Sequence, residues 1–224
     1  MNTNLLTTHE LLHLSYEETK RASQRVGVIC CGDSLTGYAN AGPVNEWPTP
    51  CYPQFLADLL VEAGYRKIVA CYGYPGEKSE GGIEIVSRCL DMFTHATFVV
   101  LGFGTNDMVE DLSTKAPIKE TLANIDVMTR AVIDARKIPI LLGTYGIEME
   151  SVDKLLFEPR LSEFNSSLCK LARQRLKYLN EALTAYAAKR EIALVDVAAA
   201  FKADTVPDGA ASLDDVACRI ADAV

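Results

Sequence analysis

The 224-residue sequence predicts an α/β fold, a three-layer α/β/α sandwich built around a five-stranded parallel sheet. Two observations lead to this fold class. Short runs rich in β-branched residues alternate along the chain with longer stretches of helical periodicity. The runs are also almost continuously apolar, which is typical of strands that helices cover on both faces.

The expected strands are Arg25–Cys31, Arg66–Cys71, Ala96–Phe103, Ile138–Thr144 and Ile192–Val197. The expected helices fill the intervals and the end of the chain, at Pro50–Ala63, Gly82–Met92, Ile118–Ala135, Leu161–Lys189 and Leu213–Ala223. The fourth helix is the clearest, because its apolar residues recur on one face at spacings near 3.6. Residues 1–24 are polar and are expected to form an N-terminal leader, which leaves residues 25–224 as one domain.

Composition limits the functions open to the chain. A net charge of −8 at pH 7 argues against a nucleic-acid partner or an anionic membrane surface. The N-terminus lacks the features of a signal peptide, and no apolar run approaches the roughly 18 residues of a membrane span. The seven cysteines form no Cys-x-x-Cys pair, which favours buried free thiols in a reducing compartment. We therefore expect a cytoplasmic protein without a metal site.

Polar residues and glycines follow the expected strands. In an open parallel sheet, ligands bind beyond the carboxyl ends of the strands. The first strand leads into Gly32-Asp33-Ser34-Leu35-Thr36 and the second into Gly73-Tyr74-Pro75-Gly76. The third leads into Gly104-Thr105-Asn106-Asp107, and the fifth is followed about ten residues later by Asp208-Gly209. A hydroxyl, a glycine, an amide and a carboxylate are therefore expected at one edge of the sheet.

Acyl transfer requires such a set of groups. A serine hydroxyl is a weak nucleophile unless a base takes its proton. The oxyanion that forms needs preplaced donors, and a glycine lets a backbone N–H approach the reacting carbonyl. Considered alone, the Ser34, Gly76 and Asn106 segments each also fit an ordinary turn or helix cap, so no single segment decides between a structural and a catalytic role.

In this order, the segments resemble the SGNH hydrolase family, also called GDSL esterases and lipases. The resemblance extends from about residue 25 to the end of the chain. It implies that Ser34 is the nucleophile and that the N–H groups of Ser34 and Gly76 and the Asn106 amide form the oxyanion hole. It implies no cofactor and a small-molecule ester as substrate, and nothing in the sequence indicates an oligomeric state.

The fourth family block departs from the pattern. The family has Asp-x-x-His before the last helix; here Asp208 matches the Asp, but Ala211 occupies the histidine position. The chain has three histidines, all at other positions. His95 precedes the third strand and is expected at the opposite end of the sheet, while His9 and His13 lie in the leader. Loss of the histidine of a serine triad costs on the order of 10⁶ in turnover, so we expect impaired activity.

Three hypotheses follow. The first is a serine acyl hydrolase that acts on a small or acylated ester through a Ser34 acyl-enzyme and is impaired by Ala211. The alternative is a non-catalytic protein of the same fold that binds an ester or a sugar. The third, based on fold alone, is a flavodoxin-like nucleotide or flavin binder, but the sequence has neither a Gly-x-Gly-x-x-Gly fingerprint nor a P-loop.

Overall fold

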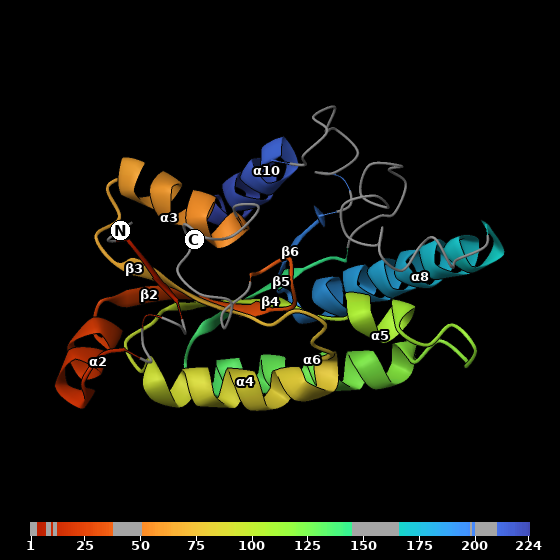
Figure 1. Ribbon diagram of the computed structural model, residues 1–224, viewed down its shortest axis with the longest axis horizontal. Coiled ribbons are helices and arrows are strands. Elements are labelled where there is room, and N and C mark those ends of the chain that lie inside the picture. Colours follow the sequence, from red (N-terminus) through yellow and green to blue (C-terminus); the bar gives the residue numbers. More distant parts are fainter. Residues whose placement is uncertain are drawn as a thin grey trace.

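The fold was analysed in a computed structural model, which describes residues 4–7, 10, 13–37, 51–144, 166–197, 199 and 210–224. A parallel sheet forms its centre, with the strand order β1-β3-β2-β4-β5-β6 (Figure 1). Every neighbouring pair of strands in this sheet is parallel. The α/β class with a parallel sheet is therefore confirmed. The strands are β1 (Leu5–Thr7), β2 (Val26–Gly32), β3 (Ile68–Gly73), β4 (Phe98–Gly102), β5 (Ile138–Leu142) and β6 (Ala193–Val195).

The sheet has six strands, one more than expected. The additional strand is β1, which lies in the segment that the sequence assigned to a polar leader and which pairs with Val69–Cys71 of β3. Its three residues are too few to stand out as an apolar run. After β1, helix α2 (Tyr16–Ser23) begins with a capping box, in which Ser15 and Glu18 each bond to the other's backbone N–H.

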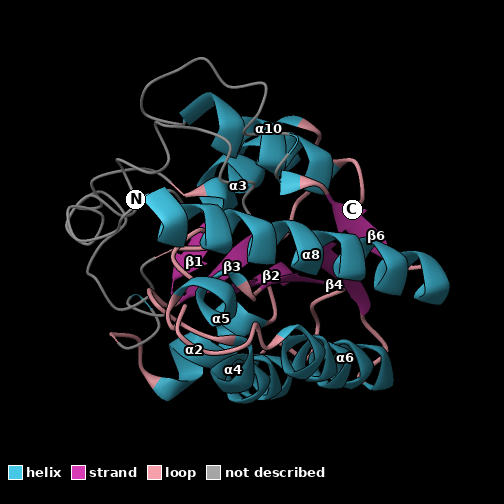
Figure 2. Cartoon of the chain, turned by 90° about the vertical axis from the view of Figure 1, so that its right-hand side faces the viewer, coloured by secondary structure: helices cyan, strands magenta, loops and turns pink. Residues whose placement is uncertain are grey.

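Helices cover both faces of the sheet, as Figures 1 and 2 show. Buried side chains of α3 (Tyr52–Glu62) and α10 (Ala210–Ala221) belong to the apolar core on one face. Buried side chains of α4 (Ser79–Met92), α6 (Ile118–Asp134) and α8 (Ser166–Arg190) belong to the core on the other. The three-layer α/β/α arrangement predicted from the sequence is therefore present.

Successive residues of the strands alternate between these two cores. In β2, for example, Ile29 and Cys31 join the core beneath α4 and α6, while Val28 and Cys30 join the core beneath α3 and α10. Both sets are fully buried, which explains why the strand reads as continuously apolar. Cys30, Cys31, Cys71 and Cys89 are buried free thiols within these cores, and Cys51 is a further buried free thiol. Among the described residues, no helix combines the length and apolar character needed to cross a bilayer.

Candidate active site

The carboxyl ends of the three central strands lie side by side. Gly32 at the end of β2 pairs in register with Gly73 of β3 and with Gly102 of β4. Because the strands are parallel and in register, the segments that follow them leave the sheet at the same edge. These are the segments that carry Ser34, Gly76 and Asn106.

Ser34 lies in a tight turn directly after β2. The Leu35 N–H donates to the Asp33 carboxylate over 3.0 Å, and the Gly37 N–H donates to the Asp33 carbonyl over 3.1 Å. These bonds fold the turn back on itself. Asp33 and Leu35 are buried, whereas Ser34 between them is partly exposed. The turn therefore presents the Ser34 residue toward the surface while its two neighbours anchor it.

Gly76 occupies a β-turn after β3. The Glu77 N–H donates to the Tyr74 carbonyl over 3.1 Å, and Gly76 has φ of +77°. A positive φ at the third position, with proline at the second, is the pattern of a type II turn. The Pro75-Gly76 pair therefore specifies this turn. Among the described residues, none accepts a hydrogen bond from the Gly76 N–H, which agrees with the free amide that this turn leaves at its third position.

The Ser34 turn packs directly against the end of β3. A Cβ atom added at Gly73 would lie only 2.2 Å from the Gly37 nitrogen and 2.4 Å from its oxygen. The Tyr74 N–H also donates to the Gly32 carbonyl over 3.0 Å. Gly73 thus permits the Ser34 and Gly76 turns to lie side by side, because any larger residue would separate their backbones.

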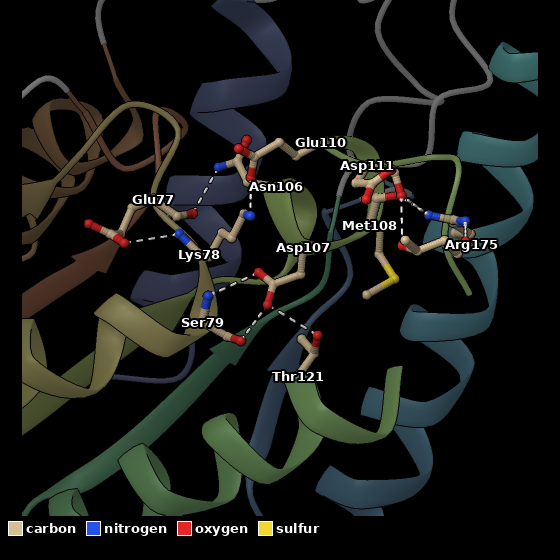
Figure 3. A network of polar contacts seen from close by, with 11 residues as sticks. Glu77, Lys78, Ser79, Asn106, Asp107, Met108, Glu110, Asp111, Thr121 and Arg175 are labelled. Atoms are coloured by element: carbon tan, nitrogen blue, oxygen red, sulfur yellow. Dashed lines mark hydrogen bonds and ion pairs between the residues drawn. The ribbon is translucent and has the colours of Figure 1, made fainter. Parts of the chain in front are cut away.

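Asn106 lies in the first turn of the short helix α5 (Thr105–Val109), which follows β4. The helix begins after Gly104, whose φ of +118° is a backbone conformation that residues with side chains rarely adopt. The Asn106 Nδ2 donates to the Glu77 carbonyl over 2.9 Å, as Figure 3 shows. Asn106 is therefore bonded to the residue that directly follows Gly76.

Helix α5 also contacts the Ser34 turn. The Asp33 N–H donates to the Gly102 carbonyl over 3.2 Å, and the Thr105 side chain bonds to the Asp33 carboxyl. Burial raises the pKa of the Asp33 carboxyl to about 7, against the opposing hydrogen bond from Leu35 and with a smaller upward contribution from the negative charge of Asp107. The carboxyl next to Ser34 is thus enclosed by protein and engaged with neighbouring residues.

Two sequence predictions concern the fourth block. Asp208 lies outside the described residues. Ala211 is the second residue of α10, the helix that begins at Ala210. Of the histidines, His95 is exposed in the connection between α4 and β4, at the opposite end of the sheet from Ser34, and His9 lies outside the described residues. In the described part of the chain, no group of three or more His, Cys, Asp or Glu side chains could hold a metal ion.

Sequence reasoning missed a set of residues that supports Asn106. Asp107 bonds to Ser79 at the start of α4 and to Thr121 of α6. The buried Arg175 of α8 donates to the carbonyls of Met108, Asp111, Leu112 and Thr114. The structure begins α4 at Ser79, three residues before the predicted start at Gly82, so the uncapped position of Lys78 was not recognised. The partner that caps the helix instead is remote in sequence.

Comparisons with known proteins agree with this fold. A GDSL-like lipase from Bacteroides thetaiotaomicron VPI-5482 is similar with a TM-score of 0.61 and 17% identity, over 96% of this chain and 93% of that one. A lipolytic G-D-S-L family member from Veillonella parvula DSM 2008 has a TM-score of 0.57 and 16% identity, over 87% and 95%. The SGNH-hydrolase family esterase AlinE4 has a TM-score of 0.52 and 18% identity, over 76% and 75%. Among curated proteins, none matches the chain.

The family can be assigned from the sequence itself. The sequence model of the GDSL-like Lipase/Acylhydrolase family matches residues 30–216, which is most of the chain. The match begins within β2, just before the Ser34 turn, and ends in α10. It therefore spans all four blocks that the sequence analysis compared with the family. This chain belongs to the GDSL-like lipase/acylhydrolase family.

Proposed function

We propose that this chain is a serine acyl hydrolase in which Ser34 attacks the carbonyl carbon of a small or acylated ester. The observation that carries the proposal is the bond from Asn106 Nδ2 to the Glu77 carbonyl. This bond joins two segments that the family resemblance assigns to one oxyanion hole, at the sheet edge where Ser34 also lies. A joined pair of donors at the same sheet edge as a partly exposed serine suits acyl transfer.

In this mechanism the Ser34 oxygen forms a bond to the carbonyl carbon while the carbonyl oxygen becomes negatively charged. The N–H groups of Ser34 and Gly76 and the Asn106 amide are its donors. Asn106 can contribute because its NH₂ group has two protons, of which Glu77 takes one. The hydroxyl proton of Ser34 passes to water. Collapse of the intermediate then breaks the bond between the carbonyl carbon and the alcohol oxygen, the alcohol takes a proton from water as it leaves, and water hydrolyses the remaining acyl-enzyme.

The mechanism lacks its usual base, because Ala211 stands at the histidine position. Asp33 does not replace it, since its carboxyl is buried and engaged with Leu35 and Thr105. An oxyanion hole and substrate binding without a complete triad retain roughly 10³–10⁴-fold acceleration over water. We therefore expect slow turnover by the natural chain.

The experiment restores the histidine. Ala211→His is expected to raise the hydrolysis of a short p-nitrophenyl ester by at least about 100-fold, because a general base next to the nucleophile contributes roughly 10²–10⁴-fold. The matched control is the double variant Ala211→His with Ser34→Ala, which should return to the background rate. An unchanged rate in Ala211→His, with the fold intact by circular dichroism, would count against the proposal.

A second function is favoured by Ala211 alone: the chain binds an ester or an acetylated sugar without hydrolysing it. The two functions differ in the reactivity of Ser34. Covalent modification of Ser34 by a fluorophosphonate supports the hydrolase, whereas ligand binding by a chain whose Ser34 stays unmodified supports the binding protein.

A further inference from the structure

Helix α4 begins without a cap of its own. Its N-cap residue is Lys78, whose side chain makes no capping hydrogen bond. Asp107, which lies 28 residues further along the chain, takes this place: the Ser79 N–H donates to its Oδ2 over 2.9 Å, and the Ser79 hydroxyl donates to its Oδ1 over 2.5 Å. A carboxylate at a helix N-terminus also meets the positive end of the helix dipole. The first turn of α5 therefore caps α4.

The same carboxylate connects a third helix. The Thr121 hydroxyl of α6 donates to Asp107 Oδ1 over 3.1 Å, and the Asn124 side chain of α6 donates to the Ser79 hydroxyl over 3.0 Å. Ser79 is fully buried and the bonds are part-buried, so they are partly shielded from water. Figure 3 shows Asp107 between Ser79 and Thr121, with Asn106 directed toward Glu77. Asp107 thus fixes α5 relative to both α4 and α6.

Asn106 and Asp107 bond to residues on either side of Lys78. Asn106 donates to the Glu77 carbonyl, and Asp107 accepts from Ser79, so two consecutive residues of α5 hold two residues of the other segment. The Glu77 carbonyl can only accept a hydrogen bond, and therefore it must face the NH₂ side of the Asn106 amide. The position of α5 thus sets both the place and the orientation of that amide beside the Gly76 turn.

A further contact between these segments, an ion pair, is weaker. Lys78 and Glu110 form an ion pair, but both side chains are about half exposed, at 45% and 53%. Exposed ion pairs contribute roughly 0–1 kcal/mol because water and salt screen them. Besides the direct bond from Asn106 to Glu77, the part-buried bonds of Asp107 therefore restrain α5 relative to the Gly76 segment more strongly than this ion pair does.

We propose that Asp107 is a positioning residue for acyl transfer: through Ser79 it holds the Asn106 amide at the oxyanion position beside Gly76. This inference rests on the proposed function. Asp107 touches no reacting atom in this account. Its contribution passes entirely through Asn106, and this property separates it from a residue that only stabilises the fold.

The test is a double-mutant cycle on the rate constant for modification of Ser34 by a fluorophosphonate, whose phosphonyl oxygen imitates the oxyanion. Asn106→Ala is expected to slow modification by roughly 100-fold, because it removes one oxyanion donor. Asp107→Ala is expected to slow it by roughly 10-fold to 100-fold, because a misplacement of about 1 Å can cost about 100-fold. In the Asn106→Ala background, Asp107→Ala is expected to have no further effect.

Asp126→Ala is the matched control. Asp126 is also a partly buried carboxylate that joins helices, since it accepts from the Tyr186 hydroxyl and pairs with Arg190. It lies on α6, and its side-chain partners among the described residues are on α6 and α8 rather than on α5. Its replacement should lower the melting temperature without slowing modification of Ser34. Ser79→Ala tests the same link and replaces Asp107→Ala in the cycle if that variant does not fold.

The outcomes separate the two proposals. An equal slowing by Asp107→Ala in the natural and Asn106→Ala backgrounds, or no slowing at all, would overturn the positioning role. An unmodified Ser34 in the natural chain would instead remove the proposed function and this inference with it. Modification of Ser34 that Asn106→Ala does not slow would overturn the role of Asn106 as a donor, and with it the role of Asp107.

Discussion

Asp33 is a buried carboxyl directly before the proposed nucleophile, and Asp33→Asn is expected to change how the stability of the protein depends on pH. Asp33 is only 3% exposed, and burial raises its pKa from 3.8 to about 7. The folded protein therefore keeps a proton on this carboxyl over a range in which the unfolded chain has lost it. Because the folded state binds more protons in that range, the free energy of unfolding falls as the pH rises from about 4 to about 7.

The size of the effect follows from the shift. A difference of about 3 pKa units lowers the free energy of unfolding by about 4 kcal/mol at neutral pH and above, relative to acidic pH. About 2.5 kcal/mol of this decrease occurs between about pH 5 and about pH 8. An asparagine has no proton to lose, and its side-chain oxygen can still accept from the Leu35 N–H. Relative to the natural chain, Asp33→Asn should therefore gain stability as the pH rises.

Urea unfolding at intervals between about pH 5 and about pH 8 measures this difference. The exposed Asp134 supplies the control, because Asp134→Asn should alter stability by less than about 0.5 kcal/mol at every pH. If the stability of Asp33→Asn and that of the natural chain followed parallel curves over this range, the reasoning about burial of Asp33 would be refuted.

The remaining predictions concern glycine and arginine positions. Gly73→Ala should prevent stable folding, because its Cβ would lie 2.2 Å from the Gly37 nitrogen. Gly76→Ala should still fold, with a free energy of unfolding lower by roughly 1–2 kcal/mol. Only its φ of +77° is unfavourable there, since no atom lies within 4 Å of the added Cβ. Circular dichroism and urea unfolding of both variants distinguish these outcomes, and equal stabilities would contradict the steric argument. Arg175→Met should lower the free energy of unfolding by about 3 kcal/mol, because buried carbonyls lose their donor. The exposed Lys177 on the same helix is its control, and Lys177→Met should cost less than about 0.5 kcal/mol.

The elements that the sequence predicted correctly are those with a strong periodic signal. Strand β2 and helix α6 have long apolar patterns, because their burial on the sheet requires them. Strand β1 was missed because it has three residues and is stabilised by pairing with β3, which its own sequence does not reveal. Helix α5 was missed because it has five residues, of which only Met108 is buried. Short elements of this kind depend on their neighbours rather than on their own propensity.

The candidate site divides in the same way. Ser34, Gly76 and Asn106 were predicted as site residues because they follow strands of a parallel sheet, and the structure places the segments that carry them in contact. The role of Asp107 could not be found, because its main partner Ser79 lies 28 residues earlier in the chain. The uncapped position of Lys78 is known only once the structure shows that α4 begins at Ser79, and the packing of α5 against α4 and α6 determines which residue caps the helix.

A crystal structure of the fluorophosphonate-treated protein would show whether Ser34 and the two proposed donors act on one carbonyl group. We expect a phosphonyl group bonded to the Ser34 Oγ, with its oxygen at about 3 Å from both the Gly76 nitrogen and the Asn106 Nδ2. A Ser34 adduct whose phosphonyl oxygen points away from both donors, or a treated protein whose Ser34 carries no adduct, would contradict this expectation.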